Sequence, residues 1–225
     1  MTVVLTGAAH AQDDAAVLFK QGAAAVMPYI ALTDRPRADP HSASGQAEMA
    51  KGIDLLARAT RAKPDYWQAF WFIGKAYQAG NDQAAAYQAL KRAYEIQPEQ
   101  VDVAREYVFE AICTSRSVEA VAAARRIAEA HPSDAGLAAN VALALLADRQ
   151  FDAASEAAAR SLRLAPNDPI TKRLSDEIVA ERTASPPPAT APSSPRCGGG
   201  RVSRPVAALV RELLEDSTVV RRVLP

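Results

Sequence analysis

The sequence predicts an all-α protein made of stacked helical hairpins. Four prolines, Pro64, Pro98, Pro132 and Pro166, recur with a constant period of 34, and a period of that length is typical of helix-turn-helix units that stack on copies of themselves. The composition agrees, because 49% of the residues are hydrophobic and only 6% are aromatic. An alanine-rich chain with few aromatic and β-branched residues suits close helix packing better than β-sheets.

The segments between the prolines carry small or apolar residues in the same columns. Small residues let two helices approach closely, and larger apolar residues fill the gaps between them. Proline then ends the second helix of each unit, because it lacks an N–H and restricts the residue before it. The aligned columns are Gly74, Val108 and Ala142; Tyr77, Ala111 and Leu145; Ala86, Ala120 and Ala154; Leu90, Ala124 and Ala158; and Ala93, Ile127 and Ser161.

These columns resemble the tetratricopeptide repeat. The unit 67–100 matches most closely, and 135–168 matches well, whereas 101–134 has Val108 and Ala111 where the family prefers glycine and tyrosine. The resemblance implies a right-handed α-solenoid with three repeats, 67–100, 101–134 and 135–168. The matching residues of the first repeat are Phe70, Ile73, Gly74, Tyr77, Ala86, Leu90, Ala93 and Pro98.

Residues 13–66 are expected to form a degenerate first hairpin that contains an inserted loop. The pattern predicts a helix over about 13–26, a proline-containing loop over 33–44 and a second helix over about 46–62. Gly52, Leu56 and Ala59 fall in the second-helix columns of the later units. Terminal repeats are often atypical because one of their faces meets solvent.

Three short polar segments, 80–82, 115–117 and 148–150, are expected to be the turns inside the regular hairpins. After the last proline, Asp168 and Pro169 have the residue types of an N-cap and a first helical position. They predict a helix over 169–183 that closes the stack.

The C-terminal residues have a different composition. Residues 184–204 are rich in proline and then in glycine, which is typical of a linker. In the tail, 205–225, apolar residues recur at helical spacing in a short stretch, at Val206, Leu209, Val210, Leu213 and Leu214. This pattern fits either a transient helix on a disordered tail or a segment that docks into the protein's own groove or onto a partner.

The first twelve residues leave two readings open. Ala9-His10-Ala11 has the small-x-small form of a signal-peptide cleavage site, so 1–12 could be a signal remnant, but the apolar stretch before it is short and holds no Lys or Arg. Export would place the protein in a periplasm-like space or outside the cell. The alternative is an ordinary alanine-rich N-terminus and a cytoplasmic protein.

Charge and cysteine content limit the partners. The 26 basic and 26 acidic residues balance, so no net field favours nucleic acid or an anionic membrane. No apolar run reaches the roughly 18 residues that span a bilayer. Cys113 and Cys197 form no metal-ligand or redox spacing, and Cys113 is expected to be a packing residue. Association of two copies through alanine-rich faces stays open.

No pattern of residues predicts catalysis or a cofactor. Gly198–Gly200 follows prolines and opens no strand–helix unit, so it is not a phosphate-binding loop. His10, His41 and His131 lie far apart in the sequence, and no nucleophile has an evident base. We therefore expect a non-catalytic protein without a bound metal or cofactor; a regulatory remnant of a transferase is the least favoured alternative.

The resemblance also implies where a ligand would bind. In such arrays the first helices of successive hairpins line a concave groove that holds a protein or peptide. Trp71 and Phe109 are the expected aromatic anchors, and Arg105 could hold a carboxylate. Members that bind C-terminal carboxylates carry polar groups where this chain has Trp71 and Ala139, so that activity is not expected. The groove residues expected by register are Gln68, Trp71, Lys75, Gln78, Arg105, Phe109, Ile112, Asn140 and Leu143.

Two functions follow as hypotheses. The first is a scaffold that binds a protein or peptide without catalysis, exported to the periplasm in the first reading of the N-terminus. The second is a cytoplasmic adaptor or regulatory module of a larger complex. Burial of Trp71, Phe109, Leu143 and Leu146 against the N-terminal helix or the tail helix is the purely structural alternative to groove binding.

Overall fold

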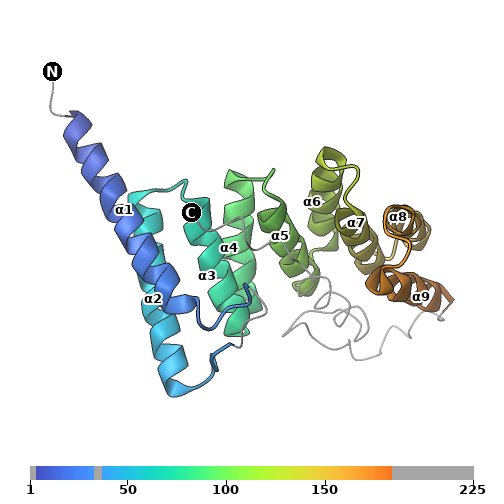
Figure 1. Cartoon of the computed structure of the whole chain (residues 1–225), viewed down its shortest axis with the longest axis horizontal. Helices are drawn as coiled ribbons and strands as arrows, with labels where there is room; N and C mark the ends of the chain where they lie inside the picture. The colour runs from blue at the N-terminus through green and yellow to red at the C-terminus, as the bar shows by residue number, and fades with distance from the viewer. Residues whose placement is uncertain (1–3, 33–36, 184–225) are drawn as a thin grey trace. The chain divides into compact units, whose positions relative to one another are not determined.

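The computed structural model describes residues 4–32 and 37–183, and all of the regular secondary structure among them is helical. Two compact units contain these residues: one holds the helices up to Gln97, and the other begins at Pro98. Figure 1 traces the helices along the chain. They are α1 (Val4–Val26), α2 (Ala43–Ala62), α3 (Trp67–Ala79), α4 (Gln83–Ile96), α5 (Val101–Cys113), α6 (Ser117–Ala130), α7 (Ala135–Ala147), α8 (Phe151–Leu164) and α9 (Pro169–Thr183). The expected linker 184–204 and tail 205–225 lie outside the described residues.

The helix bounds repeat with the period of the prolines. The first helices α3, α5 and α7 each contain 13 residues, and the second helices α4, α6 and α8 each contain 14. Each first helix begins one full period after the previous one, and α9 begins one period after α7. The all-α hairpin fold predicted from the sequence is therefore confirmed.

The turn inside each regular hairpin has the same backbone conformation. Asn81, Ser115 and Arg149 have φ angles of 62°, 62° and 61°. The following residue in each turn donates its N–H five residues back, for example from Asp82 to the carbonyl of Tyr77 at 2.9 Å. This is the Schellman pattern, which satisfies carbonyl groups at the end of the first helix.

The middle turn corrects the sequence-based prediction by one residue. The expected turn was 115–117, but α5 ends at Cys113 and α6 begins at Ser117, so the turn is 114–116. Ser115 takes the left-handed conformation. The repeat period fixes this register, since Ser115 lies one period from both Asn81 and Arg149.

The periodic prolines lie in the turns that connect one hairpin to the next. Each second helix ends two residues before its proline, and the residue between them is the C-cap, as at His131 before Pro132. The N–H of Asp134 then donates to the carbonyl of His131 at 3.1 Å, and Asp168 makes the same bond to Ala165 at 3.2 Å. Proline occupies the second position of these turns, where its fixed φ is favourable.

In the second unit the helices form two layers. The first helices α5, α7 and α9 pack against each other in order, and α6 and α8 each pack between successive first helices. The alanine column of the second helices, Ala120 and Ala154, is fully buried. Because these side chains are small, the helices of each hairpin can approach closely.

The first unit contains the hairpin with the inserted loop. Helices α1 and α2 run side by side in opposite directions (Figure 1), and α3 packs against both of them and against α4. A Cβ atom on Gly22 of α1 would lie 2.9 Å from the carbonyl oxygen of Gly52 on α2, and the reverse distance is the same. The two glycines are therefore what allows the two backbones to touch.

Helix α1 is longer than the sequence predicted. The expected helix began near Asp13, but α1 begins at Val4, so Asp13 and Asp14 lie inside it and not at its positive end. Residues 4–13 contain no proline and several alanines, and alanine is the best helix former. The helix therefore includes residues 4–12, which are part of the possible signal remnant.

Helix α9 closes the second unit as predicted. Asp168 is its N-cap, because its carboxylate accepts from the backbone N–H groups of Ile170 at 3.2 Å and Thr171 at 3.0 Å. Thr171, Leu174 and Ile178 are buried. Lys172 and Asp176 are exposed, so one face covers the stack and the other meets water.

Candidate ligand-binding surface on the first helices

The structure divides the expected ligand-binding residues between its two units. Gln68, Trp71, Lys75 and Gln78 lie on α3 in the first unit. Arg105, Phe109 and Ile112 lie on α5, and Asn140 and Leu143 lie on α7, in the second unit. Within each helix the spacing of three, four or seven residues places the side chains on one face. We use the term first-helix face for each of these two sets of residues and describe the two sets separately.

On α3 the expected anchor is largely buried. Trp71 is 2% exposed and Lys75 is 6% exposed, whereas Gln68 and Gln78 are half-buried. The Lys75 ammonium lies 5.9 Å from the centre of the Trp71 ring, within the range of a cation–π interaction.

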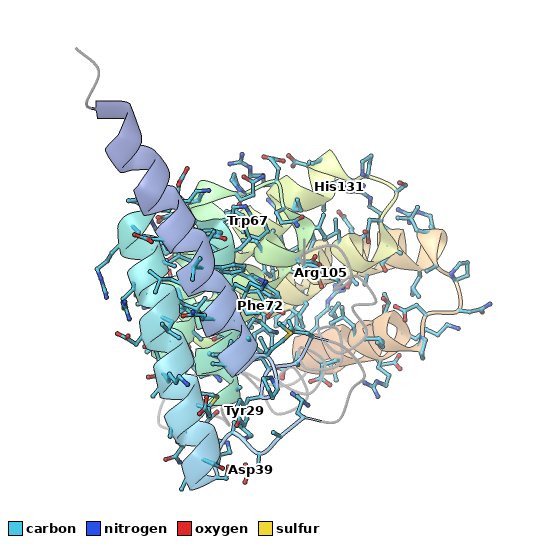
Figure 2. All side chains as sticks on the ribbon, turned by 60° about the vertical axis from the view of Figure 1, so that its left-hand side comes forward. Tyr29, Asp39, Trp67, Phe72, Arg105 and His131 are labelled. Atoms are coloured by element: carbon cyan, nitrogen blue, oxygen red, sulfur yellow. The ribbon has the colours of Figure 1, made fainter. Side chains whose placement is uncertain are left out.

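An aromatic chain fixes this part of α3 to α1. The ring of Trp71 meets Phe72 edge-on at 5.3 Å, and Phe72 meets Phe19 of α1 edge-on at 5.6 Å. Figure 2 labels Phe72 beside α1. Phe19 also packs on Tyr66 at 4.8 Å. Edge-to-face pairs of this kind stabilise the fold beyond the effect of the area that they bury. These contacts therefore hold the Trp71 ring in place.

The indole N–H of Trp71 is a polar group without a hydrogen-bond acceptor. Among the buried side-chain nitrogens and oxygens of the described residues, Trp71 Nε1 is the one that makes no hydrogen bond. Buried tryptophan usually satisfies this donor. Sequence reasoning selected Trp71 for its aromatic area and missed the unsatisfied donor, which depends on the surroundings and has no sequence signal.

In the second unit, Arg105 and Phe109 are half-buried, and Ile112, Asn140 and Leu143 are buried. The guanidinium of Arg105 lies against the first turn of α7, since its Nη2 would be 3.7 Å from a Cβ atom on Gly136. Arg105 and Phe109 are therefore the accessible side chains of this part of the first-helix face. Figure 2 labels Arg105 on α5.

Helix α5 also carries buried carboxylates. Asp102 and Glu106 are 7% and 9% exposed, and Glu110 is fully buried. Glu110 was missed, although its column holds alanine in the neighbouring repeats, at Ala76 and Ala144. A charged residue in a column of alanines was the available signal.

Two ionisable groups elsewhere are perturbed. Burial raises the pKa of the Tyr66 hydroxyl. Burial and the neighbouring Glu181 raise the pKa of the Glu177 carboxyl. Neither group belongs to the first-helix face. In residues 4–32 and 37–183 no group of three metal-binding side chains is found, and none of the helices there is long and apolar enough to cross a membrane. Cys113 is buried on α5.

A scan against protein-family models gives no match for this chain, and a search of curated proteins gives none either.

Proposed function

We propose that this chain is a tetratricopeptide-like scaffold that binds a protein or peptide through its first-helix face and carries out no catalysis. The observation that supports the proposal most directly is the strict repetition of the hairpin, with first helices of 13 residues at a period of 34. Repeats of this kind expose their first helices along one side, and such surfaces serve as binding sites.

Two accessible side chains of the second unit define the proposed contact. Phe109 offers aromatic area, and Arg105 offers a planar donor that can pair with a carboxylate or a carbonyl group. Both are half-buried on α5, so their side chains are partly held in place before a ligand binds. A preorganised contact loses less entropy on binding. We propose a periplasm-like compartment, which rests on the cleavage-site pattern at 9–11.

The test is capture of partners from the native host by the tagged full-length protein, followed by mass spectrometry. We expect Phe109→Ala to lower the recovery of specific partners at least tenfold, because aromatic anchors often contribute about 2 kcal/mol or more. Phe151→Ala is the matched control, since Phe151 is also half-buried but lies at the start of a second helix.

Far-UV circular dichroism must show equal helicity for both variants. If Phe109→Ala and Phe151→Ala retain the same partners in the same amounts as the original protein, the first-helix face is not the binding surface.

A further inference from the structure

Among the described residues, an arginine that recurs in the second helices has a carboxylate partner in two repeats but not in the last. The column holds Arg92 in α4, Arg126 in α6 and Arg160 in α8, each one period after the other. Arg92 forms an ion pair with Glu95 at 3.2 Å. Arg126 forms one with Glu99 at 2.6 Å. Arg160 forms none with any residue that the structure describes.

The turns that connect the hairpins explain this difference. Glu99 lies in the turn before α5, where its Oε1 accepts from Nε and Nη2 of Arg126 at 3.1 and 2.6 Å. One period later the same position holds Ser133, which is exposed and carries no charge. The guanidinium of Arg160 still lies at this turn, because its Nη2 donates to the carbonyl of Pro132 at 2.9 Å. Arg160 is therefore held in position, while a serine stands where the earlier repeat supplies a carboxylate.

Two further differences change the charge and the polarity of the same helix face. Arg163 and Leu164 follow Arg160 at three and four residues, so the three side chains share one side of α8. The preceding repeat has Glu129 and Ala130 at these two positions. Arg163 is exposed and forms no ion pair with a described residue, and Leu164 is 42% exposed. The last turns of α8 thus combine two arginines with an exposed apolar side chain.

We propose that this surface, formed by Ser133, Arg160, Arg163 and Leu164, binds an acidic segment of a partner protein. A glutamate or aspartate of the partner accepts from the guanidinium of Arg160, as the carboxylate of the preceding repeat does for its arginine. An apolar side chain of the partner, one helical turn away, covers Leu164. The surface belongs to the second helices of the second unit, so it is separate from the first-helix face and does not depend on the function proposed for that face.

The acidic group beside this surface limits the kind of partner. Asp134 follows Ser133 directly in the sequence and accepts the backbone N–H of Leu137 at 2.9 Å, as the N-cap of α7. Its negative charge repels a densely charged polyanion, whereas a single carboxylate on Arg160 gains more from the guanidinium than it loses. Nucleic acid carries closely spaced phosphates, so a protein segment with few carboxylates and an apolar side chain fits the surface better.

Short fluorescein-labelled peptides test the proposal on the full-length protein. Each peptide carries one glutamate and one leucine three or four residues apart on an alanine–glutamine background, and its twin has glutamine in place of the glutamate. We expect the glutamate peptide to bind at least about threefold more tightly than its twin, which is the size of one exposed ion pair. Arg160→Gln should remove this preference.

Ser133→Glu is the second variant, because it places a carboxylate of the protein itself where the preceding repeat has Glu99. We expect it to pair with Arg160 and to remove the preference for the glutamate peptide as well. Ser133→Gln is the matched control, since it has the same size without the charge, and it should keep the preference. Far-UV circular dichroism must show equal helicity for all variants.

Equal binding of the two twin peptides overturns the proposal, as does a preference that survives both Arg160→Gln and Ser133→Glu. Equally tight binding of a single-stranded oligothymidylate also overturns it, because the surface would then accept any anion. Phe109→Ala should leave the peptide preference unchanged. If the preference is absent while partner capture depends on Phe109, the proposed function stands without this inference. If the preference is present but capture never depends on Phe109, the reverse holds.

Discussion

At the scale of single residues, the two helices of a hairpin pack together because a small side chain on one helix faces a larger side chain on the other. A Cβ atom on Gly74 of α3 would lie 2.5 Å from Cγ of Leu90 on α4, which is closer than real atoms approach. In the next repeat the same two columns hold Val108 and Ala124. In this repeat the larger side chain is on the first helix, whereas in the repeat before it the larger side chain is on the second helix.

This exchange predicts a measurable coupling. Gly74→Val should destabilise the protein by about 1–3 kcal/mol through overpacking, and Leu90→Ala by about 2–5 kcal/mol through a cavity. The double variant reproduces the pairing of Val108 with Ala124, so its cost should fall below the sum by about 0.5–3 kcal/mol. Urea unfolding followed by circular dichroism measures each value.

The control for this cycle combines Gly74→Val with Leu137→Ala, a fully buried leucine of α7 in the second unit. We expect those two costs to add. Additivity in the Gly74–Leu90 cycle would contradict the packing argument.

At the scale of the helix, side-chain N-caps begin some helices and left-handed residues end others, whereas α3, α5, α6 and α8 begin without a side-chain cap. Asp82, Asp134 and Asp168 each accept a backbone N–H from the first turn of the helix that follows, at 3.0, 2.9 and 3.0 Å. The left-handed residues Asn81, Ser115 and Arg149 end the first helices in the same way three times. The hydrogen bonds of these caps and turns form between residues a few positions apart, so a short sequence motif is enough to specify them.

The contribution of the N-cap of α9 to stability can therefore be measured apart from that of its buried side chains. Asp168→Ala removes both hydrogen bonds to the first turn, and we expect a loss of about 0.5–2 kcal/mol with faster amide exchange in the first turn of α9. Asp176→Ala, an exposed carboxylate on the same helix, should change neither stability nor exchange. Equal effects of the two substitutions would show that charge, not capping, is responsible.

At the scale of the whole molecule, stability should be distributed along the chain. Each helix packs mainly on those next to it in sequence, and the chain separates into two compact units. In such quasi-one-dimensional proteins stability is close to a sum of repeat and neighbour terms. A local defect should then open its own region and leave remote regions closed.

Native-state hydrogen exchange tests this expectation. Leu90→Ala should speed amide exchange in α3 and α4, and Leu174→Ala in α8 and α9, each with little change in the other region. The two leucines are both fully buried, so the substitutions are matched in type. A uniform change across both units after either substitution would mean that the chain unfolds as one cooperative body.

The sequence alone determined the elements of this protein. The proline period, the columns of small residues and the cap at Asp168 predicted hairpins that the structure reproduces, because helix starts, turns and helix ends depend on hydrogen bonds and backbone angles within a few neighbouring residues. Its errors were local as well: the middle turn is 114–116 and not 115–117, and α1 continued past Asp13 to Val4.

Only the tertiary structure decided which side chains of the first-helix face are accessible. The sequence predicted both Trp71 and Phe109 as aromatic anchors of the groove. In the structure Trp71 is buried with an unsatisfied N–H, while Phe109 is half-buried. Glu110 likewise became a fully buried carboxylate in a column of alanines. Periodicity fixes the direction in which a side chain points from its helix, but its exposure depends on residues far away in the sequence that fold against it.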